Sequence, residues 1–194
     1  GILKGLKHFD YFHIDVMDGH FVEPINLNLN LFKLLRNYFD IPIIAHLMVE
    51  NPILFIDKLV NYVEYFVFHY ECDDDLNTVI EKVREKNTMV GIAINPPTNI
   101  SKIIPYLNLI DLVLVMTVHP GWSGQKFIPE LVEKINHLAV YKQKYEFHID
   151  VDGGVNLENA KKLKNADILS SASTILNSED PNHVIQLLKS SDSN

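Results

Sequence analysis

Short apolar runs alternate with amphipathic stretches along the whole chain. The runs are rich in Ile, Val, Phe and Leu, and polar residues, Gly or Pro bound each of them. This pattern is typical of buried strands. It predicts strands at residues 12–17, 43–49, 65–69, 90–95, 112–118, 147–152 and 168–171.

Helices are predicted between these strands. Apolar residues follow i, i+3, i+4, i+7 spacing within residues 31–38, and residues 128–141 repeat this pattern. Asn156 is a suitable N-cap for a further helix, and Pro181 lies near the start of the last one.

The alternation of strands and helices predicts a parallel sheet covered by helices. An open sheet that binds a nucleotide commonly carries Gly-x-Gly-x-x-Gly or a Gly-rich phosphate loop, and the chain has neither. Polar residues such as His13, His46 and Asp152 instead fall at the strand ends, as at the rim of a barrel enzyme. The predicted fold class is α/β, a (βα)8 TIM barrel in one domain over residues 1–194, with one strand missing from the count of eight.

Composition and charge exclude several classes of protein. The chain has 194 residues, of which 47% are hydrophobic and 22% charged, and this is ordinary for a globular protein. A net charge of −8 without a basic stripe argues against nucleic acid as a partner. No apolar run approaches the roughly 18 residues of a membrane span. Neither a membrane partner nor a secretory signal is expected, and the single cysteine, Cys72, fits a cytoplasmic location.

Two histidines and two aspartates form the candidate chemistry. His13 and Asp15 are two positions apart in a predicted strand and therefore share one face. His46 and Asp152 come from two other strands and are expected to point into the same barrel mouth. Imidazole and carboxylate groups can together surround one divalent ion. The same four residues could also form a metal-free hydrogen-bonded network, and the spacing alone leaves both interpretations open.

Six stretches of the chain resemble the ribulose-phosphate 3-epimerase family, including its close relative D-allulose-6-phosphate 3-epimerase. They come in the family's order and read FHIDVMDGHFV from Phe12, HLMVENP from His46, FHYE from Phe68, GIAINPPT from Gly91, LVMTVHPGWSGQKF from Leu114 and VDGGV from Val151. The first and fifth are highly specific. The resemblance covers about residues 6–190 and implies a barrel of the ribulose-phosphate-binding type.

The resemblance also implies roles for individual residues. The implied metal ligands are His13, Asp15, His46 and Asp152, and the implied acid/base pair is Asp15 and Asp152. Implied contacts to the sugar phosphate are His46, Gly121, Ser123, Gly124, Gln125, Gly153, Gly154, Ala172 and Ser173. Met17, Met48 and Met116 match a layer that lines the family's site. One divalent ion is implied, with Zn favoured over Fe, Mn or Co.

The implied reaction is epimerisation at C3 of a ketose phosphate, D-ribulose 5-phosphate to D-xylulose 5-phosphate, in the pentose phosphate pathway. It needs one base on each side of a planar cis-enediolate, which suits two facing aspartates. D-allulose 6-phosphate is the alternative substrate. A non-catalytic or truncated paralogue that binds sugar phosphate is the alternative class, because the family's first strand is absent and Ala172 stands where glycine is usual.

Two further expectations concern the surroundings of the site. His69 and Glu71 follow the third predicted strand and are expected to support the rim by hydrogen bonding. Relatives of this family form dimers or hexamers, so a homo-oligomer is expected.

Overall fold

Seven parallel strands form the curled sheet of the computed structural model, which describes residues 2–193. The parallel strands are β1 (Phe12–Asp18), β3 (Ile43–Met48), β4 (Tyr65–His69), β5 (Met89–Ile94), β6 (Leu112–Met116), β7 (His148–Asp152) and β8 (Ile168–Ser170). They follow one another in chain order, and the two-residue strand β2 (Ile25–Asn26) pairs antiparallel with the end of β1. The predicted α/β barrel architecture is confirmed, and every predicted strand is present with small shifts at its ends.

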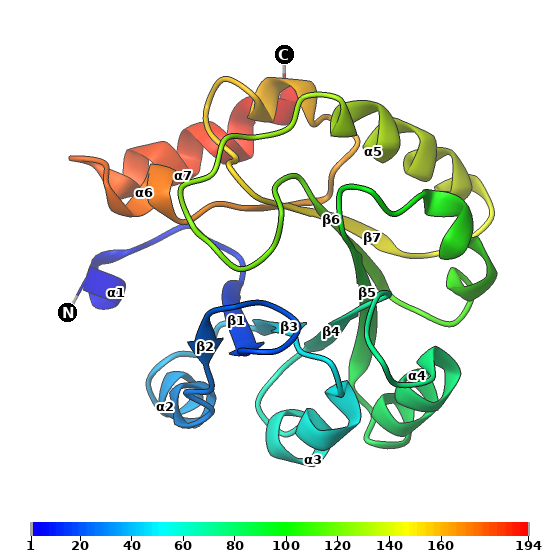
Figure 1. Ribbon diagram of the computed structural model, residues 1–194. Helices are drawn as coiled ribbons and strands as arrows, with labels where there is room; N and C mark the ends of the chain where they lie inside the picture. The colour runs from blue at the N-terminus through cyan, green and yellow to red at the C-terminus, as the bar shows by residue number, and fades with distance from the viewer. Residues whose placement is uncertain (1, 194) are drawn as a thin grey trace.

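Helices cover the outside of this sheet, as Figure 1 shows. They are α1 (Ile2–Gly5), α2 (Asn30–Tyr38), α3 (Ile56–Leu59), α4 (Leu76–Glu85), α5 (Leu131–Val140), α6 (Ser173–Leu176) and α7 (Pro181–Lys189). Short 3-10 turns lie at Pro52–Phe55, Ile100–Lys102, Ile104–Tyr106, Tyr141–Gln143, Ala160–Lys162 and Ser190–Ser193. No helix among residues 2–193 combines the length and the apolar character that crossing a membrane requires.

The helix predicted to open at Asn156 is present only as a 3-10 turn, although the predicted cap is formed. The Asn156 side-chain oxygen accepts hydrogen bonds from the backbone N–H groups of Glu158 and Asn159, as an N-cap does. Only a 3-10 turn, Ala160–Lys162, follows before β8. Residues 153–167 must cross from the end of β7 to the start of β8, and this short connection leaves room for little more than one turn.

Burial follows the alternation of side chains along each strand. Residues such as Phe66, Phe68 and Ile92 point outward and pack under the helices, where they are fully buried. Residues of the opposite parity point into the barrel, and their apolar members form a second cluster with Val67, Leu114 and Met116. The polar residues of this inward set therefore lie next to a packed apolar cluster inside the barrel.

The barrel wall is interrupted between β8 and β1, and we call this interruption the seam. Among residues 2–193, no ladder of backbone hydrogen bonds joins these two strands. The segment before β1 and helix α7 close the outside of the seam: Lys7 N donates to Asn182 Oδ1 at 2.7 Å, and Lys189 Nζ lies 2.8 Å from Asp10 Oδ1. Residues 2–193 thus contain seven parallel strands, and the contacts of the first segment with α7 cover the gap between the first and the last of them.

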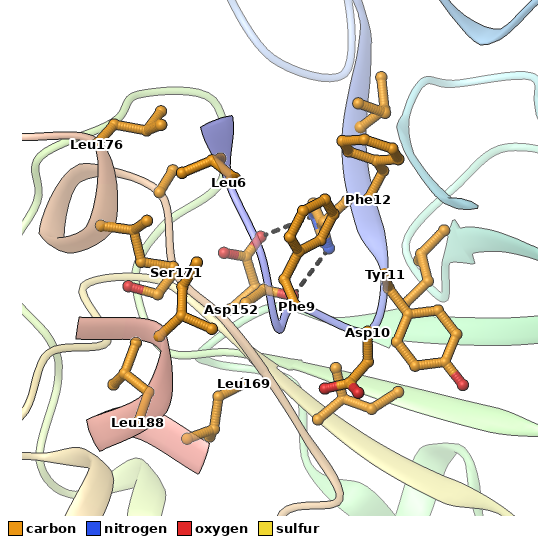
Figure 2. A pocket seen from close by; sticks show the side chains of 18 of the residues that line it. Leu6, Phe9, Asp10, Tyr11, Phe12, Asp152, Leu169, Ser171, Leu176 and Leu188 are labelled. Carbon is orange, nitrogen blue, oxygen red and sulfur yellow. Dashed lines mark hydrogen bonds and ion pairs between the residues drawn. The ribbon is translucent and has the colours of Figure 1, made fainter. Parts of the chain in front are cut away.

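A cavity of about 620 Å³ lies along the seam. Figure 2 shows Leu6 and Phe9 of the first segment standing between the β1 side, with Phe12, and the β8 and α7 side, with Leu169 and Leu188. Asp152 lies deeper, at the inner end of this cavity. The seam therefore reaches from the apolar outside of the barrel to the polar interior.

Candidate metal centre

The strands bring four predicted residues together, and we call His13, Asp15, His46 and Asp152 the His/Asp site. His13 and Asp15 point inward from β1, and the parallel register places Asp15 directly beside His46 of β3. Asp152 is the last residue of β7 and approaches from the far side of the seam. Three strands therefore contribute ligand atoms that all lie within 4.8 Å of one another.

Three of the five distances within the His/Asp site match a tetrahedral ion, and the other two are slightly shorter. His46 Nδ1 lies 3.0 Å from Asp15 Oδ1 and 3.6 Å from Asp152 Oδ2. His13 Nε2 lies 3.1 Å from Asp15 Oδ1, 3.3 Å from Asp152 Oδ2 and 3.3 Å from His46 Nδ1. Zinc–ligand bonds of about 2.0–2.2 Å in a tetrahedron require ligand atoms about 3.3–3.6 Å apart. The donor set therefore has both the chemistry and the spacing for one divalent ion.

Electrostatics at the site favour a positive charge. Burial lowers the pKa of His13, but the carboxylates of Asp152 and Asp15 outweigh it and raise that pKa well above its usual value. Burial raises the pKa of Asp15, yet hydrogen bonds from His13 and His46 hold it well below its usual range. In the absence of an ion, a proton on His13 offsets part of the negative charge of the neighbouring carboxylates. A divalent cation can take over that role.

The nitrogen of each ring that faces away from the His/Asp site is also occupied. His46 Nε2 lies 2.8 Å from His69 Nε2, and His69 Nδ1 lies 3.2 Å from Glu71 Oε2. Burial lowers the pKa of His69 to about 4, so this ring is neutral near pH 7. The expected hydrogen-bonding role of His69 and Glu71 is therefore seen in the structure, directed at a ring of the site rather than at the rim in general.

His13 has a different outer partner, which the sequence analysis missed. Its Nδ1 lies 2.9 Å from Ser170 Oγ, and this hydroxyl donates to Asp150 Oδ1 at 3.0 Å. Asp150 is fully buried, and burial raises its pKa to about 6. Its position two residues before Asp152 was the available signal, since residues two apart on a strand share a face.

A second cavity, of about 260 Å³, opens above the His/Asp site. Every residue that the resemblance implies as a substrate contact or as site lining borders this cavity: Met17, His46, Met48, Met116, Gly121, Ser123, Gly124, Gln125, Gly153, Gly154, Ala172 and Ser173. Asp15 and Asp152 border it as well, whereas His13 borders the seam cavity. The structure thus places the predicted set, apart from His13, around one space.

Close backbone contacts shape the roof of this cavity. Gly154 has a φ of +66°, and a Cβ there would lie 2.6 Å from the backbone nitrogen of Phe127. The loop after β6 can therefore lie directly on the loop after β7 only because residue 154 is glycine. Within the first loop, Gln125 Nε2 donates to the carbonyl oxygens of His119 and Trp122 and holds the turn together.

Ala172 fits its position without backbone strain. Its φ is −108°, outside the left-handed region that would demand glycine. The side chain is exposed, and its backbone oxygen accepts a hydrogen bond from Leu176 at 2.8 Å. Alanine at this position is therefore compatible with the loop conformation.

Comparisons with known proteins agree with this geometry. Residues 4–176 match the model of the family described as "Ribulose-phosphate 3 epimerase family". A curated ribulose-phosphate 3-epimerase of Methanocaldococcus jannaschii is 36% identical over 184 residues, which cover 93% of this chain and 78% of that protein. The Bacillus subtilis protein of the same name is 35% identical over 188 residues, covering 94% and 87%.

Solved structures of lower identity share the fold. One structure of KGPDC from Streptococcus mutans has a TM-score of 0.70 at 13% identity, covering 95% of this chain and 85% of that one. The 3-hexulose-6-phosphate synthase from Salmonella typhimurium has a TM-score of 0.66 at 16% identity, covering 95% and 87%.

Proposed function

Because the chain belongs to the ribulose-phosphate 3-epimerase family, we propose that it interconverts D-ribulose 5-phosphate and D-xylulose 5-phosphate by epimerisation at C3. The observation that carries this proposal is the His/Asp site, in which two imidazoles and two carboxylates from three strands converge under a cavity of about 260 Å³. Two carboxylates within reach of one space are what a two-base proton transfer requires.

His13, Asp15, His46 and Asp152 would hold one divalent ion, and zinc suits their tetrahedral spacing best. Fe, Mn and Co accept the same donor types. When bound, the ion supplies positive charge that stabilises the negative charge developing on the substrate oxygens.

Asp15 and Asp152 are assigned to proton transfer. The proton at C3 is acidic because C3 is next to the C2 carbonyl, and its removal gives a planar enediolate. One aspartate accepts the proton from one face, and the other donates a proton to the opposite face. Their roles exchange when the reaction runs backwards. They come from β1 and β7 and can therefore lie on opposite sides of a sugar in the cavity.

The phosphate is assigned to the loops after β7 and β8. Gly153, Gly154 and Ser173 all border the cavity, where backbone N–H groups and the Ser173 hydroxyl can serve as donors to a phosphate. Gly121, Ser123, Gly124 and Gln125 of the loop after β6 would cover the substrate from above. Loops after the last strands hold phosphate in many barrels of this kind.

A coupled assay tests this function directly. Protein loaded with Zn²⁺, Fe²⁺, Mn²⁺ or Co²⁺ is supplied with D-ribulose 5-phosphate, and the formation of D-xylulose 5-phosphate is followed. In D₂O the product should carry deuterium at C3, because the transferred proton exchanges with solvent. Inactivity with all four ions would refute the proposal. A higher kcat/KM on D-allulose 6-phosphate than on D-ribulose 5-phosphate would identify the former as the substrate, and the reaction would still be epimerisation at C3.

Two expectations remain proposals of their own. We propose a homo-oligomer, which light scattering of the purified protein tests. We also propose a cytoplasmic location, because a single cysteine suits a reducing compartment. Fractionation of cells that produce the protein tests this second proposal.

A further inference from the structure

Two buried imidazole rings meet nitrogen to nitrogen behind the His/Asp site. His46 and His69 are both 0% exposed, and their Nε2 atoms are 2.8 Å apart. Two ring nitrogens at this distance share a single proton, so one ring must donate and the other must accept. This choice decides which nitrogen of His46 carries its proton, and thus whether its Nδ1 is free to bind an ion.

Glu71 determines which ring donates. Its Oε2 lies 3.2 Å from His69 Nδ1, and a carboxylate can only accept a hydrogen bond. His69 therefore carries its proton on Nδ1, and its bare Nε2 accepts from His46 Nε2–H. His46 Nδ1 then keeps its lone pair. Nδ1 is the atom that lies 3.0 Å from Asp15 Oδ1 and 3.3 Å from His13 Nε2, at the centre of the His/Asp site.

The orientation of Glu71 is itself fixed. Its Oε1 accepts a hydrogen bond from the backbone N–H of Asn95 at 2.9 Å and another from the hydroxyl of Thr98. The backbone N–H of Asn95 cannot reverse its direction. An oxygen is therefore required at the Oε1 position, and Oε2 is left to face His69.

We propose that Glu71 is a positioning residue that sets the tautomer of His46 through His69, so that the Nδ1 lone pair of His46 faces the metal ion. We call His46, His69 and Glu71 the His46 relay. The inference rests on the metal site proposed above. It adds to that site a residue that touches neither the ion nor the substrate.

The relay competes with Asp15 for the proton of His46. Without an ion, His46 Nδ1–H can donate to Asp15 Oδ1, which lies 3.0 Å away. With an ion at the site, two protons remain for the contacts between His46 and His69 and between His69 and Glu71. Only one arrangement gives each of these two contacts a proton, and that arrangement requires an acceptor at Glu71 Oε2.

The variant Glu71→Gln reverses the relay while changing almost no volume. The carboxamide oxygen must take the Oε1 position, because the Asn95 N–H is a fixed donor there. The carboxamide NH₂ group then faces His69 Nδ1 and donates to it. His69 in turn donates through Nε2–H to His46, whose proton is moved to Nδ1. In the metal-free protein this arrangement lets every contact of the relay form a hydrogen bond. It disfavours metal binding, because the proton on His46 Nδ1 occupies the lone pair that an ion needs.

Zn²⁺ affinity is the main measurement, by competition with a chromophoric chelator. We expect Glu71→Gln to weaken Zn²⁺ binding about 10- to 100-fold, the range typical of residues behind metal ligands. The thermal midpoint of the metal-free variant should stay close to that of the wild type. A residue with a merely structural role would instead lower that midpoint and leave Zn²⁺ affinity unchanged.

Glu64→Gln is the matched control. Glu64 also accepts a backbone N–H, that of Ile43 at 2.8 Å, and it also has a side-chain partner, Arg36, but it touches no histidine. Its Zn²⁺ affinity should stay within about threefold of the wild type. Thr98→Val removes one donor to Glu71 without reversing the relay, and its effect should be small.

The ¹⁵N shifts of the imidazole nitrogens report the tautomer without any variant. In the Zn²⁺-loaded wild type, His69 should carry its proton on Nδ1. In metal-free Glu71→Gln, the proton should be on Nε2. If Glu71→Gln does not fold, the shift of His69 in the loaded wild type decides the question.

The outcomes separate this inference from the proposed function. Equal Zn²⁺ affinity of Glu71→Gln and Glu64→Gln, or a proton on His69 Nε2 in the loaded wild type, overturns the relay. Epimerase activity of the wild type would survive that result. A wild type that binds Zn²⁺ as the relay requires but epimerises no ketose phosphate refutes the proposed function alone. A wild type that binds no Zn²⁺, Fe²⁺, Mn²⁺ or Co²⁺ refutes both.

Discussion

The wall of the barrel, from β3 to β7, and the seam between β8 and β1 close the same structure by different means. Neighbouring strands of the wall are joined by continuous parallel ladders, and most of their side chains are fully buried. Across the seam, the side chains of Asn182 and Lys189 hydrogen-bond to the segment before β1, and Ser170 Oγ contacts His13 Nδ1, around a cavity of about 620 Å³. Stability is therefore concentrated in the wall.

The His/Asp site spans both regions. His46 and its relay lie within the wall, and β1 is joined to the wall through its ladder with β3. Asp152 belongs to the last wall strand, and from there only β8 and the seam separate it from His13 on β1. An ion at the site would therefore link the two sides of the seam where no backbone ladder does. Chemistry and closure of the barrel would depend on the same four side chains.

The largest effect is expected from breaking the link across the seam. Asp152→Asn removes a proposed proton donor and a proposed metal ligand at once, and we expect activity to fall by about 10²- to 10⁴-fold, the range for loss of one acid/base group. The coupled epimerase assay measures this. Asp167→Asn, at the other end of the barrel, is the control and should keep nearly full activity. Comparable losses in both variants would contradict the assignment.

Truncating an apolar side chain should lower the unfolding free energy more in the wall than beside the seam. Leu47→Ala opens a hole in the fully buried wall and should cost about 2–5 kcal/mol of unfolding free energy. Leu169→Ala lies beside the seam cavity, is only partly buried and should cost about 1 kcal/mol. Urea unfolding of the metal-free protein measures both. Equal costs would mean that the seam is packed as tightly as the wall.

Metal binding should stabilise the strands beside the seam more than those of the wall. Zn²⁺ at 100 times its dissociation constant should add about 2.7 kcal/mol of stability, because the ion binds only the folded state. Hydrogen exchange should show added protection in β1 and β8, and little change in β5. A uniform gain over all strands would show that the ion does not act on the seam in particular.

The smallest effect concerns a polar link between β1 and the wall. Burial raises the pKa of Asp18, but hydrogen bonds from the backbone N–H groups of Glu50, His20 and Phe21 outweigh it and lower that pKa. Because the folded-state pKa is depressed, this contribution is full above about pH 4 and is lost as the pH falls through the folded value. Asp18→Asn should cost about 1–2 kcal/mol at pH 7.

The difference between Asp18→Asn and the wild type should shrink in acid, since the wild type then loses the same charge. Urea unfolding at pH 7 and pH 3 tests this. A difference that is constant between these two pH values would show that the carboxylate charge of Asp18 does not contribute.

Much of the fold could be predicted because its signals are local. The apolar runs and their polar ends identify all seven parallel strands, and Pro181 marks the last helix correctly. The helix after Asn156 could not be predicted in length, because the cap is a local signal whereas the span between β7 and β8 depends on where those strands lie. Tertiary context decided how far that helix could extend.

The four residues of the His/Asp site could be found from the sequence because each lies on a strand with clear alternation, and the family resemblance implied that they share one ion. Ser170 and Asp150 were not found as partners of His13. The contact of Ser170 with His13 joins β8 to β1 across the seam. These positions are 157 residues apart, so spacing along the chain cannot predict it.

The sequence by itself determined which faces of the strands are polar, which residues reach the barrel mouth and which family the chain resembles. Only the tertiary structure decided how the ring nitrogens are paired, with His46 backed by His69 and Glu71, and how the first segment and α7 cover the seam. Side-chain periodicity is a property of one strand and can be read along it. The direction of a shared proton and the closure of a sheet depend on atoms from different strands, and their distances exist only after folding.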